Sequence, residues 1–254
     1  MSQLGPTAAT AQLRADAARI TELIGTGQLD ATVPDCPGWQ LRDLIAHLGT
    51  IHRWAAECVR TAQEPTTPWA DMHRDLLDDE LQDWFARGAA ELVDALEAHS
   101  PDDPTWTPFP IDAPTVSIWI RRQTHETSLH RRDAEAALQQ VGLGVIRPID
   151  AELAADGVDE YLGVIVPRLV QRDGRRLPSG SAHLHCTDTP GEWTVEVLDG
   201  DYVIDRSHRK GDAAVRAPAE AMLLQLWGRT VPDGAIEVFG DAEVAAAWLG
   251  IGGN

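Results

Sequence analysis

One polar segment, residues 121–133 (RRQTHETSLHRRD), most constrains how this chain can fold. Apolar residues at helical spacing on both sides of it, among them Val116 and Leu138, predict one long helix. Glu126 and His130 are four residues apart, so they lie one above the other on a helix face that we expect to point toward the core. A buried carboxylate needs a proton, a cation or a metal. The segment therefore predicts either a buried ion pair or two ligands of a metal site.

A second predicted helix supplies the candidate third ligand. His47 falls among apolar residues that recur at helical spacing, including Leu44 and Leu48. Taken alone, a histidine on an apolar face is more often a hydrogen-bonded core residue than a ligand. Two histidines and a carboxylate, all at positions where hydrophobic residues are expected, favour a metal site formed by His47, Glu126 and His130.

Composition limits the class of protein. The 254 residues are 43% hydrophobic and include nine Trp, which indicates one large folded domain or two ordinary ones. No apolar run approaches the roughly 18 residues that span a bilayer, and the N-terminus lacks the pattern of a signal peptide, so we expect a cytoplasmic protein. The three cysteines, Cys36, Cys58 and Cys186, do not suggest a disulfide framework.

The formal net charge of -19 argues against nucleic-acid binding. An acidic protein repels phosphate backbones unless it has a local basic patch, and the arginine clusters here are small and scattered. We interpret the acidity as a source of solubility.

The chain is expected to have an α+β fold with two domains. Residues 1–147 show four amphipathic helical patterns with clear breaks, which predict a four-helix bundle. Residues 148–254 predict a smaller α+β domain, in which helices and alternating strands follow one another. Its expected elements are a helix at 150–169, strands at 182–186, 193–197, 202–205 and 213–216, a helix at 218–228, a strand at 236–239 and a last helix ending at Trp248.

Four motifs carry a resemblance to a known family. They are DCPGW at 35–39, DLIAHL at 43–48, HETSLHRRDAE at 125–135 and RAPAEAMLLQLWGR at 216–229. Together they resemble the mycothiol-dependent maleylpyruvate isomerase family. The resemblance covers nearly the whole chain, and it implies a DinB-like metal-binding four-helix bundle followed by the family's C-terminal domain.

The resemblance implies a zinc site at His47, Glu126 and His130, the same three residues that helical register selects. Three protein ligands with one open position are typical of catalytic rather than structural zinc. Two histidines and one carboxylate also suit Fe²⁺, and Ni²⁺ and Mn²⁺ are not excluded. Zinc is preferred because of the family.

The same resemblance implies a thiol-dependent reaction. A metal-bound thiol loses its proton near neutral pH, and the expected thiol is mycothiol as co-substrate. In an isomerase the thiolate adds to a cis double bond, the new single bond rotates and the thiolate leaves; an S-transferase keeps the thiol joined to the small electrophile. Arg229 matches a family arginine that would hold a substrate carboxylate. A surface arginine at a helix C-terminus is an equally good interpretation of Arg229.

Two alternatives stay open from the sequence. One is a metal-dependent hydrolase on the same bundle, which would use metal-bound hydroxide. Alternatively, the protein is a non-enzymatic metal-binding or ligand-binding protein.

Several further polar residues are weaker candidates. Cys36 precedes a predicted helix, but its Pro-Gly context favours a tight turn with a half-buried thiol over a nucleophile. Asp133, one further turn from His130 on roughly the same face, is expected either to orient a ligand histidine or to cap the end of the site. His52 and His125 lie off the inward faces and are interpreted as supporting or surface residues, although His125 would replace a ligand if the helical register slipped.

His183 and His185 alternate with apolar residues along one predicted strand. They share one face and could bind a metal. We interpret them instead as part of a solvated sheet face.

Overall fold

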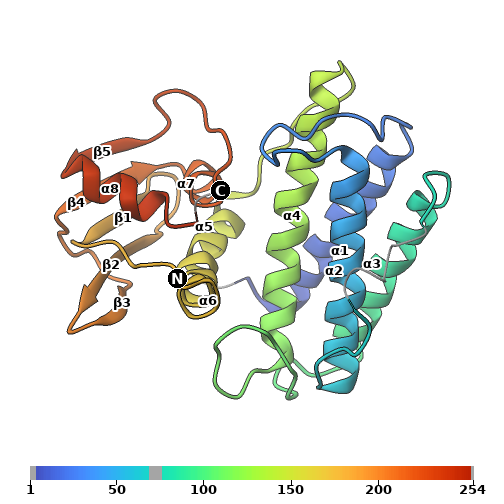
Figure 1. Ribbon diagram of the computed structural model, residues 1–254, viewed down its shortest axis with the longest axis horizontal. Coiled ribbons are helices and arrows are strands. Elements are labelled where there is room, and N and C mark those ends of the chain that lie inside the picture. The colour runs from blue at the N-terminus through green and yellow to red at the C-terminus, as the bar shows by residue number, and fades with distance from the viewer. Residues whose placement is uncertain (1–3, 69–75, 253–254) are drawn as a thin grey trace. The chain divides into compact units, whose positions relative to one another are not determined.

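The computed structural model describes residues 4–68 and 76–252. The chain divides into two compact units, Gly5–Pro148 and a second that begins at Ile149. The first is helical and the second combines helices with one sheet (Figure 1), so the expected α+β class is confirmed.

Four long helices form the first unit: α1 (Pro6–Ile24), α2 (Leu41–Thr61), α3 (Leu81–Glu97) and α4 (Val116–Gln140). Their starts and ends follow from local sequence. Pro6 occupies the first turn of α1, where its missing N–H costs nothing. A capping box between Gln40 and Asp43 begins α2 and so fixes the register of the helix that carries His47.

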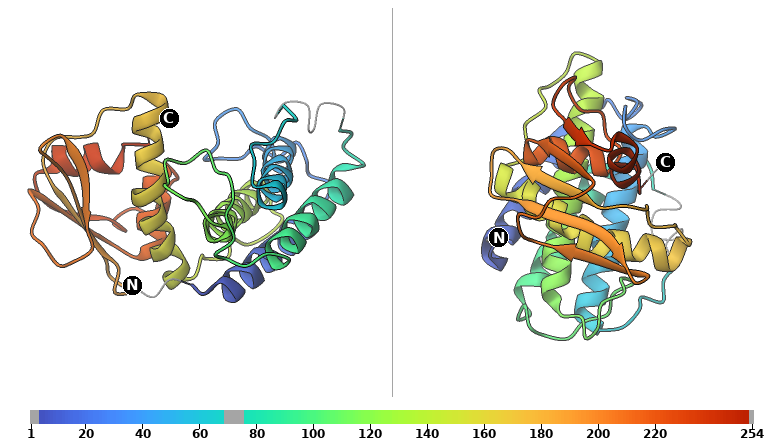
Figure 2. Two further views of the ribbon diagram at one scale, coloured as in Figure 1. Left: turned by 90° about the horizontal axis from the view of Figure 1, so that it is seen from below. Right: turned by 90° about the vertical axis from the view of Figure 1, so that its left-hand side faces the viewer.

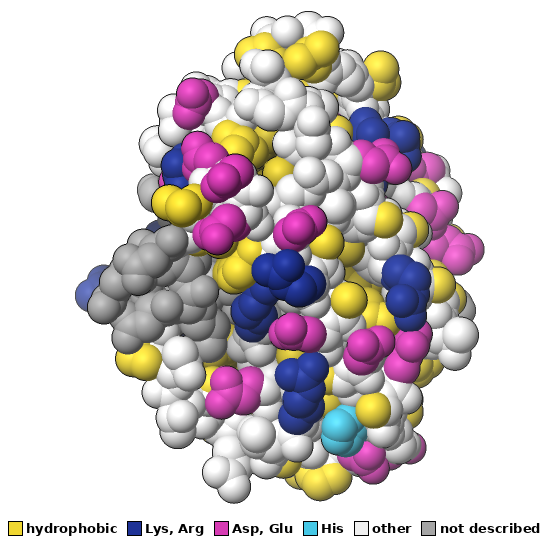
Figure 3. All heavy atoms as spheres, turned by 90° about the vertical axis from the view of Figure 1, so that its right-hand side faces the viewer, with side chains coloured by type: hydrophobic (Ala, Val, Ile, Leu, Met, Phe, Trp, Pro, Cys, Tyr) yellow, Lys and Arg dark blue, Asp and Glu magenta, His cyan; other side chains and the backbone are white. Residues whose placement is uncertain are grey.

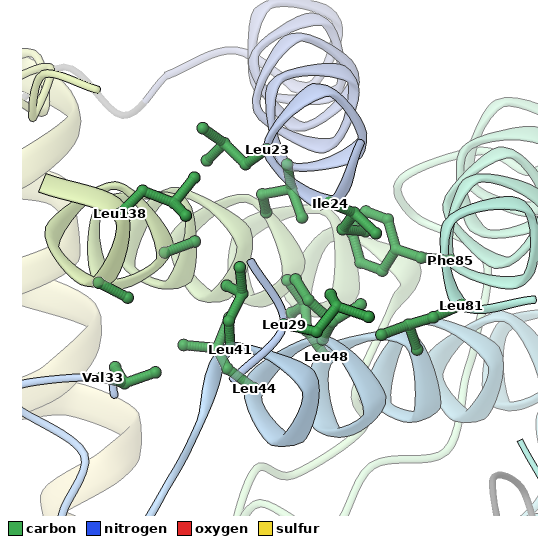
Figure 4. Packing of buried hydrophobic residues seen from close by; sticks show 14 of the residues in the cluster. Leu23, Ile24, Leu29, Val33, Leu41, Leu44, Leu48, Leu81, Phe85 and Leu138 are labelled. Carbon is green, nitrogen blue, oxygen red and sulfur yellow. The ribbon is translucent and has the colours of Figure 1, made fainter. Parts of the chain in front are cut away.

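The core of the bundle lies between these helices. Buried leucines from α1, α2 and α4 share one hydrophobic cluster with Phe85 of α3 (Figure 4), and many of these side chains are fully buried. Helices α2 and α3 approach closely at Gly49, where an added Cβ would lie 2.2 Å from the Trp84 ring. Arg53 stacks on the same ring, 3.9 Å from its centroid, and donates to the Gly49 carbonyl.

The second unit begins with a long helical segment, which the sequence predicts as a single helix ending at residue 169. The structure divides it into α5 (Ala151–Glu160), a π-helical turn η2 (Tyr161–Ile165) and α6 (Val166–Asp173). Pro167 has no N–H to donate, which explains an irregular helix just before it.

A five-stranded sheet follows, with order β3-β2-β1-β4-β5. Its strands and following helices are β1 (Ala182–Cys186), β2 (Glu192–Leu198), β3 (Asp201–Asp205), β4 (Ala213–Ala217), α7 (Ala219–Leu226), β5 (Glu237–Gly240) and α8 (Ala242–Leu249). Strands β1 and β4 are parallel and the other pairs are antiparallel.

The sheet has one apolar face and one polar face, because side chains alternate along each strand. Leu184 and Trp193 are register partners on the apolar face, and Trp193 Nε1 donates to Asp159 of α5 at 2.9 Å. In the right-hand view of Figure 2 the sheet lies in front of α5. His183 and His185 therefore belong to the polar face, away from that helix.

Charged side chains of both signs are interspersed on the face of the molecule in Figure 3. Within the described residues, no helix combines the length and the apolar character that crossing a bilayer requires.

Candidate metal centre

His47, Glu126 and His130 converge in the bundle. Glu126 Oε1 lies 3.5 Å from His47 Nε2 and 3.3 Å from His130 Nε2. One ligand atom from each residue lies within 4.8 Å of the others, and α2 and α4 supply them. The side chain of His47 is 29% exposed, whereas those of Glu126 and His130 are 12% and 8% exposed. The structure thus brings together all three predicted ligands at a centre that is open on the His47 side.

Two neighbours on α4 set the charges of this centre. Burial alone would raise the pKa of Glu126, but Arg122, at 2.5 Å from its other oxygen, and the two histidines hold that pKa well below its ordinary range. Burial alone would lower the pKa of His130, but hydrogen bonds to Asp133 and Glu126 raise it to about 9. The expected orienting role of Asp133 agrees with its 3.0 Å contact with His130 Nδ1.

The turn before α2 forms one side of the centre. Gly38 adopts a φ of 82°, in the left-handed region that favours glycine, and leads directly into Trp39. The Trp39 ring lies 4.9 Å from that of His47 and 6.5 Å from that of His130. Cys36, which is half-buried in the turn, has its Sγ 3.8 Å from Asp133 Oδ2.

His52 and His125 are both buried, so the surface interpretation of these residues is wrong. His52 Nε2 lies 2.9 Å from Thr127 Oγ1, and burial lowers its pKa to about 3. His125 is 5% exposed and is not part of the converging group found among the described residues. Both histidines lie off the apolar stripe of their helix, which is why the sequence suggested exposure. They are buried because neighbouring helices cover more than one face of α2 and α4.

The predicted solvated face at His183 and His185 is also only partly correct. His183 is 7% exposed and His185 is half-buried. Both are close to Glu192 and His208, which the sequence analysis did not single out. Glu192 could have been predicted from the sequence as a neighbour on the adjacent strand. The position of His208 depends on the fold of a loop, so the sequence carried no comparable signal for it.

Arg229 lies three residues beyond Leu226, the last residue of α7. Its Nη1 donates to the Trp227 carbonyl at 2.8 Å, which is a typical contact at a helix C-terminus. Arg229 has further interactions, and its role toward a substrate stays a prediction.

The donors of the centre fit a metal. Two imidazole Nε2 atoms face the same carboxylate oxygen, and Asp133, which can only accept when ionised, keeps a proton on His130 Nδ1. A metal ion would take the place of the proton that the raised pKa keeps on His130 Nε2 beside Glu126. Arg122 was not predicted, although its spacing of four residues from Glu126 is a visible signal.

Comparison with protein-family models assigns both parts of the chain. The mycothiol maleylpyruvate isomerase N-terminal domain matches residues 8–135, which is half of the chain. The chain belongs to this family. The C-terminal domain of the same family matches residues 152–247, so the expected recognition is confirmed for both units. Membership in this family agrees with the expectation of an enzyme.

Two solved structures share the fold. One is a mycothiol-dependent maleylpyruvate isomerase, with a TM-score of 0.64, 14% identity, and coverage of 94% of this chain and 95% of that one. The other is a histidine-to-alanine mutant of an enzyme of the same name, with a TM-score of 0.62, 13% identity, and coverage of 89% and 91%. Comparison with curated protein sequences gives no match.

Proposed function

We propose that this chain is a metal- and mycothiol-dependent enzyme that acts on a small electrophile, as a cis-trans isomerase or an S-transferase. The observation that carries the proposal is the convergence of His47 Nε2, Glu126 Oε1 and His130 Nε2 within 4.8 Å in a member of this family. Zinc is the preferred ion, since two imidazoles and one carboxylate with room for a fourth ligand suit a catalytic zinc site.

A bound dication would supply acidity, because it lowers the pKa of a coordinated thiol toward neutral pH. The protein's own residues prepare that centre. Asp133 holds the His130 ring and its tautomer, and Arg122 occupies Glu126 Oε2 so that Oε1 faces the histidines. The Trp39 ring lies beside both histidine rings, at 4.9 Å from that of His47 and 6.5 Å from that of His130.

The proposed reaction begins with a thiolate. Its sulfur forms a bond to one carbon of a double bond conjugated to a carbonyl, and the π electrons move to the carbonyl oxygen. Rotation about the carbon–carbon bond that is now single, followed by return of the electrons from the oxygen to re-form the double bond as the thiolate leaves, gives the trans isomer. Retention of the C–S bond, with a proton added at the neighbouring carbon, gives an S-conjugate. Arg229 is proposed to bind a substrate carboxylate through its planar guanidinium.

Metal content tests the centre. We would measure bound zinc by elemental mass spectrometry in a protein that carries H185A and H208A. These replacements remove two histidines of the cluster in the second unit, so that only zinc bound in the bundle is counted. Single H47A, E126Q and H130A replacements should each lower the bound zinc, and H99A, which removes a histidine outside both clusters, should not. Full zinc occupancy after any two of the three replacements would contradict the proposed site.

A thiol-dependence assay tests the chemistry. Unsaturated dicarbonyl acids and other soft electrophiles would be incubated with the wild-type protein, with and without mycothiol. The proposal expects turnover only with the thiol, and its loss in H47A. Turnover of a substrate at the same rate without added thiol would reject this function and favour a hydrolase on the same bundle.

A further inference from the structure

The second unit contains a cluster that the proposed function does not use. We propose that His183, His185, Glu192 and His208 form a second metal site, for zinc or a divalent ion of similar preference. One ligand atom from each of the four lies within 4.8 Å of the others. None of these residues belongs to the centre in the bundle.

The strand register places two histidines and the carboxylate together. His183 and His185 are two residues apart on β1, so both project from its polar face. His185 is the register partner of Glu192 on β2, and its Nδ1 lies 2.7 Å from Glu192 Oε1. These three positions are therefore fixed by backbone pairing rather than by flexible side chains.

The loop between β3 and β4 supplies the fourth residue. Thr194 of β2 donates to the Arg209 carbonyl at 3.0 Å, and the Arg209 side chain pairs with Glu196 of the same strand. These contacts hold the loop against the polar face of the sheet. His208 consequently reaches Glu192, with its Nδ1 2.9 Å from Oε2.

One atom of the cluster indicates a missing partner. His183 Nε2 is buried, and no described residue makes a hydrogen bond to it; Glu192 Oε2 is 3.6 Å away, beyond hydrogen-bond distance. A buried polar atom without a partner is costly and calls for an explanation. A metal ion bound to this nitrogen would satisfy it.

The donor set indicates both the ion and the role. Imidazole and carboxylate ligands suit zinc, nickel or copper rather than magnesium or calcium. Four protein ligands close the coordination shell of tetrahedral zinc, which is typical of a structural site. The ion would join β1, β2 and the loop that carries His208, and so would stabilise the sheet of the second unit.

Zinc binding to the full-length chain tests this inference. The background carries H47A and H130A, which remove the bundle site, so its result is independent of the proposed function. Zinc would be titrated against a chromophoric chelator, and Co²⁺ spectra would report the geometry. We expect one equivalent bound at low micromolar free zinc, with absorption typical of tetrahedral Co²⁺.

Loss of ligands gives the decisive comparison. His208 is 78% exposed, so H208A should fold normally, and it should weaken zinc binding more than about 100-fold, since loss of a group that merely orients a ligand already costs ~10–100-fold. H185A should have the same effect, and H99A should have none. Unchanged zinc affinity in the protein that carries both H208A and H185A would overturn the site. So would binding of less than one equivalent of zinc by the H47A, H130A protein, if its circular dichroism spectrum is native.

Discussion

Asp133 accepts a hydrogen bond from His130 Nδ1 at 3.0 Å, and the two residues lie about one turn apart on α4. The carboxylate is 1% exposed, so it is both fixed and protected from water. This bond turns the other ring nitrogen of His130 toward His47 and Glu126. The three proposed ligands thus depend on a fourth side chain that is not itself one of them.

Replacing Asp133 with Asn keeps the shape of the side chain but removes its charge. D133N should weaken zinc binding at the bundle centre by ~10–100-fold, since the orienting carboxylate raises the basicity of its histidine and fixes its tautomer. Competition with a chelator, in the H185A, H208A background, measures this change. D102N, at an exposed aspartate, is the control. Equal zinc affinity in D133N and the unmodified background would show that the hydrogen bond has no such role.

Burial of His52 should make stability depend on pH. Its pKa is lowered from 6.5 to about 3, so the unfolded chain binds a proton that the folded protein excludes between these values. Stability from this residue is complete above pH 6.5 and decreases as the pH falls, by about 1.4 kcal/mol per pH unit. The free energy of unfolding of wild type minus that of H52Q should fall by about this amount from pH 7.5 to 5.5. A difference that stays constant, or an NMR titration of His52 near pH 6.5, would contradict it.

Close packing at Gly49 should make α2 intolerant of a side chain. G49V should destabilise the protein by ~1–3 kcal/mol, because the new atoms meet the Trp84 ring that Arg53 holds in place. Denaturant unfolding measures the change. In a double-mutant cycle, W84L should recover part of the loss. Additive effects of G49V and W84L would show that the ring is not the obstacle.

The cysteines should differ in reactivity. Burial raises the pKa values of Cys58 and Cys186 to about 12. At pH 8 each has on the order of 1000-fold less thiolate than a free cysteine. We expect iodoacetamide to modify these two only after unfolding, as followed by mass spectrometry. C36S, which removes the half-buried thiol, should therefore be unlabelled when native and doubly labelled in urea. Rapid native labelling of C36S would be inconsistent with the buried positions.

The local sequence pattern was sufficient to predict most helices and strands and the three residues that converge in the bundle. The spacing of Glu126 and His130 follows directly from helical geometry, as does the inward direction of His47. The alternation around Leu184 likewise predicts a strand. These features depend on residues a few positions apart, whose relative placement the backbone period alone determines.

The placement of the Trp39 ring beside the rings of His47 and His130, by contrast, depends on tertiary packing. So does the burial of His52 and His125, because neighbouring helices rather than helical period decide how many faces are covered. The π-helical turn at 161–165 was also not visible in the apolar pattern.

The sequence by itself determined the helices, the strands, the three candidate ligands and the family motifs. Only the tertiary structure decided that His183 is buried and that His208 meets Glu192, which lies 16 residues away in the chain. The physical reason is that a strand's period specifies which side chains share a face, whereas the loop that covers that face is placed by contacts such as Thr194 with Arg209.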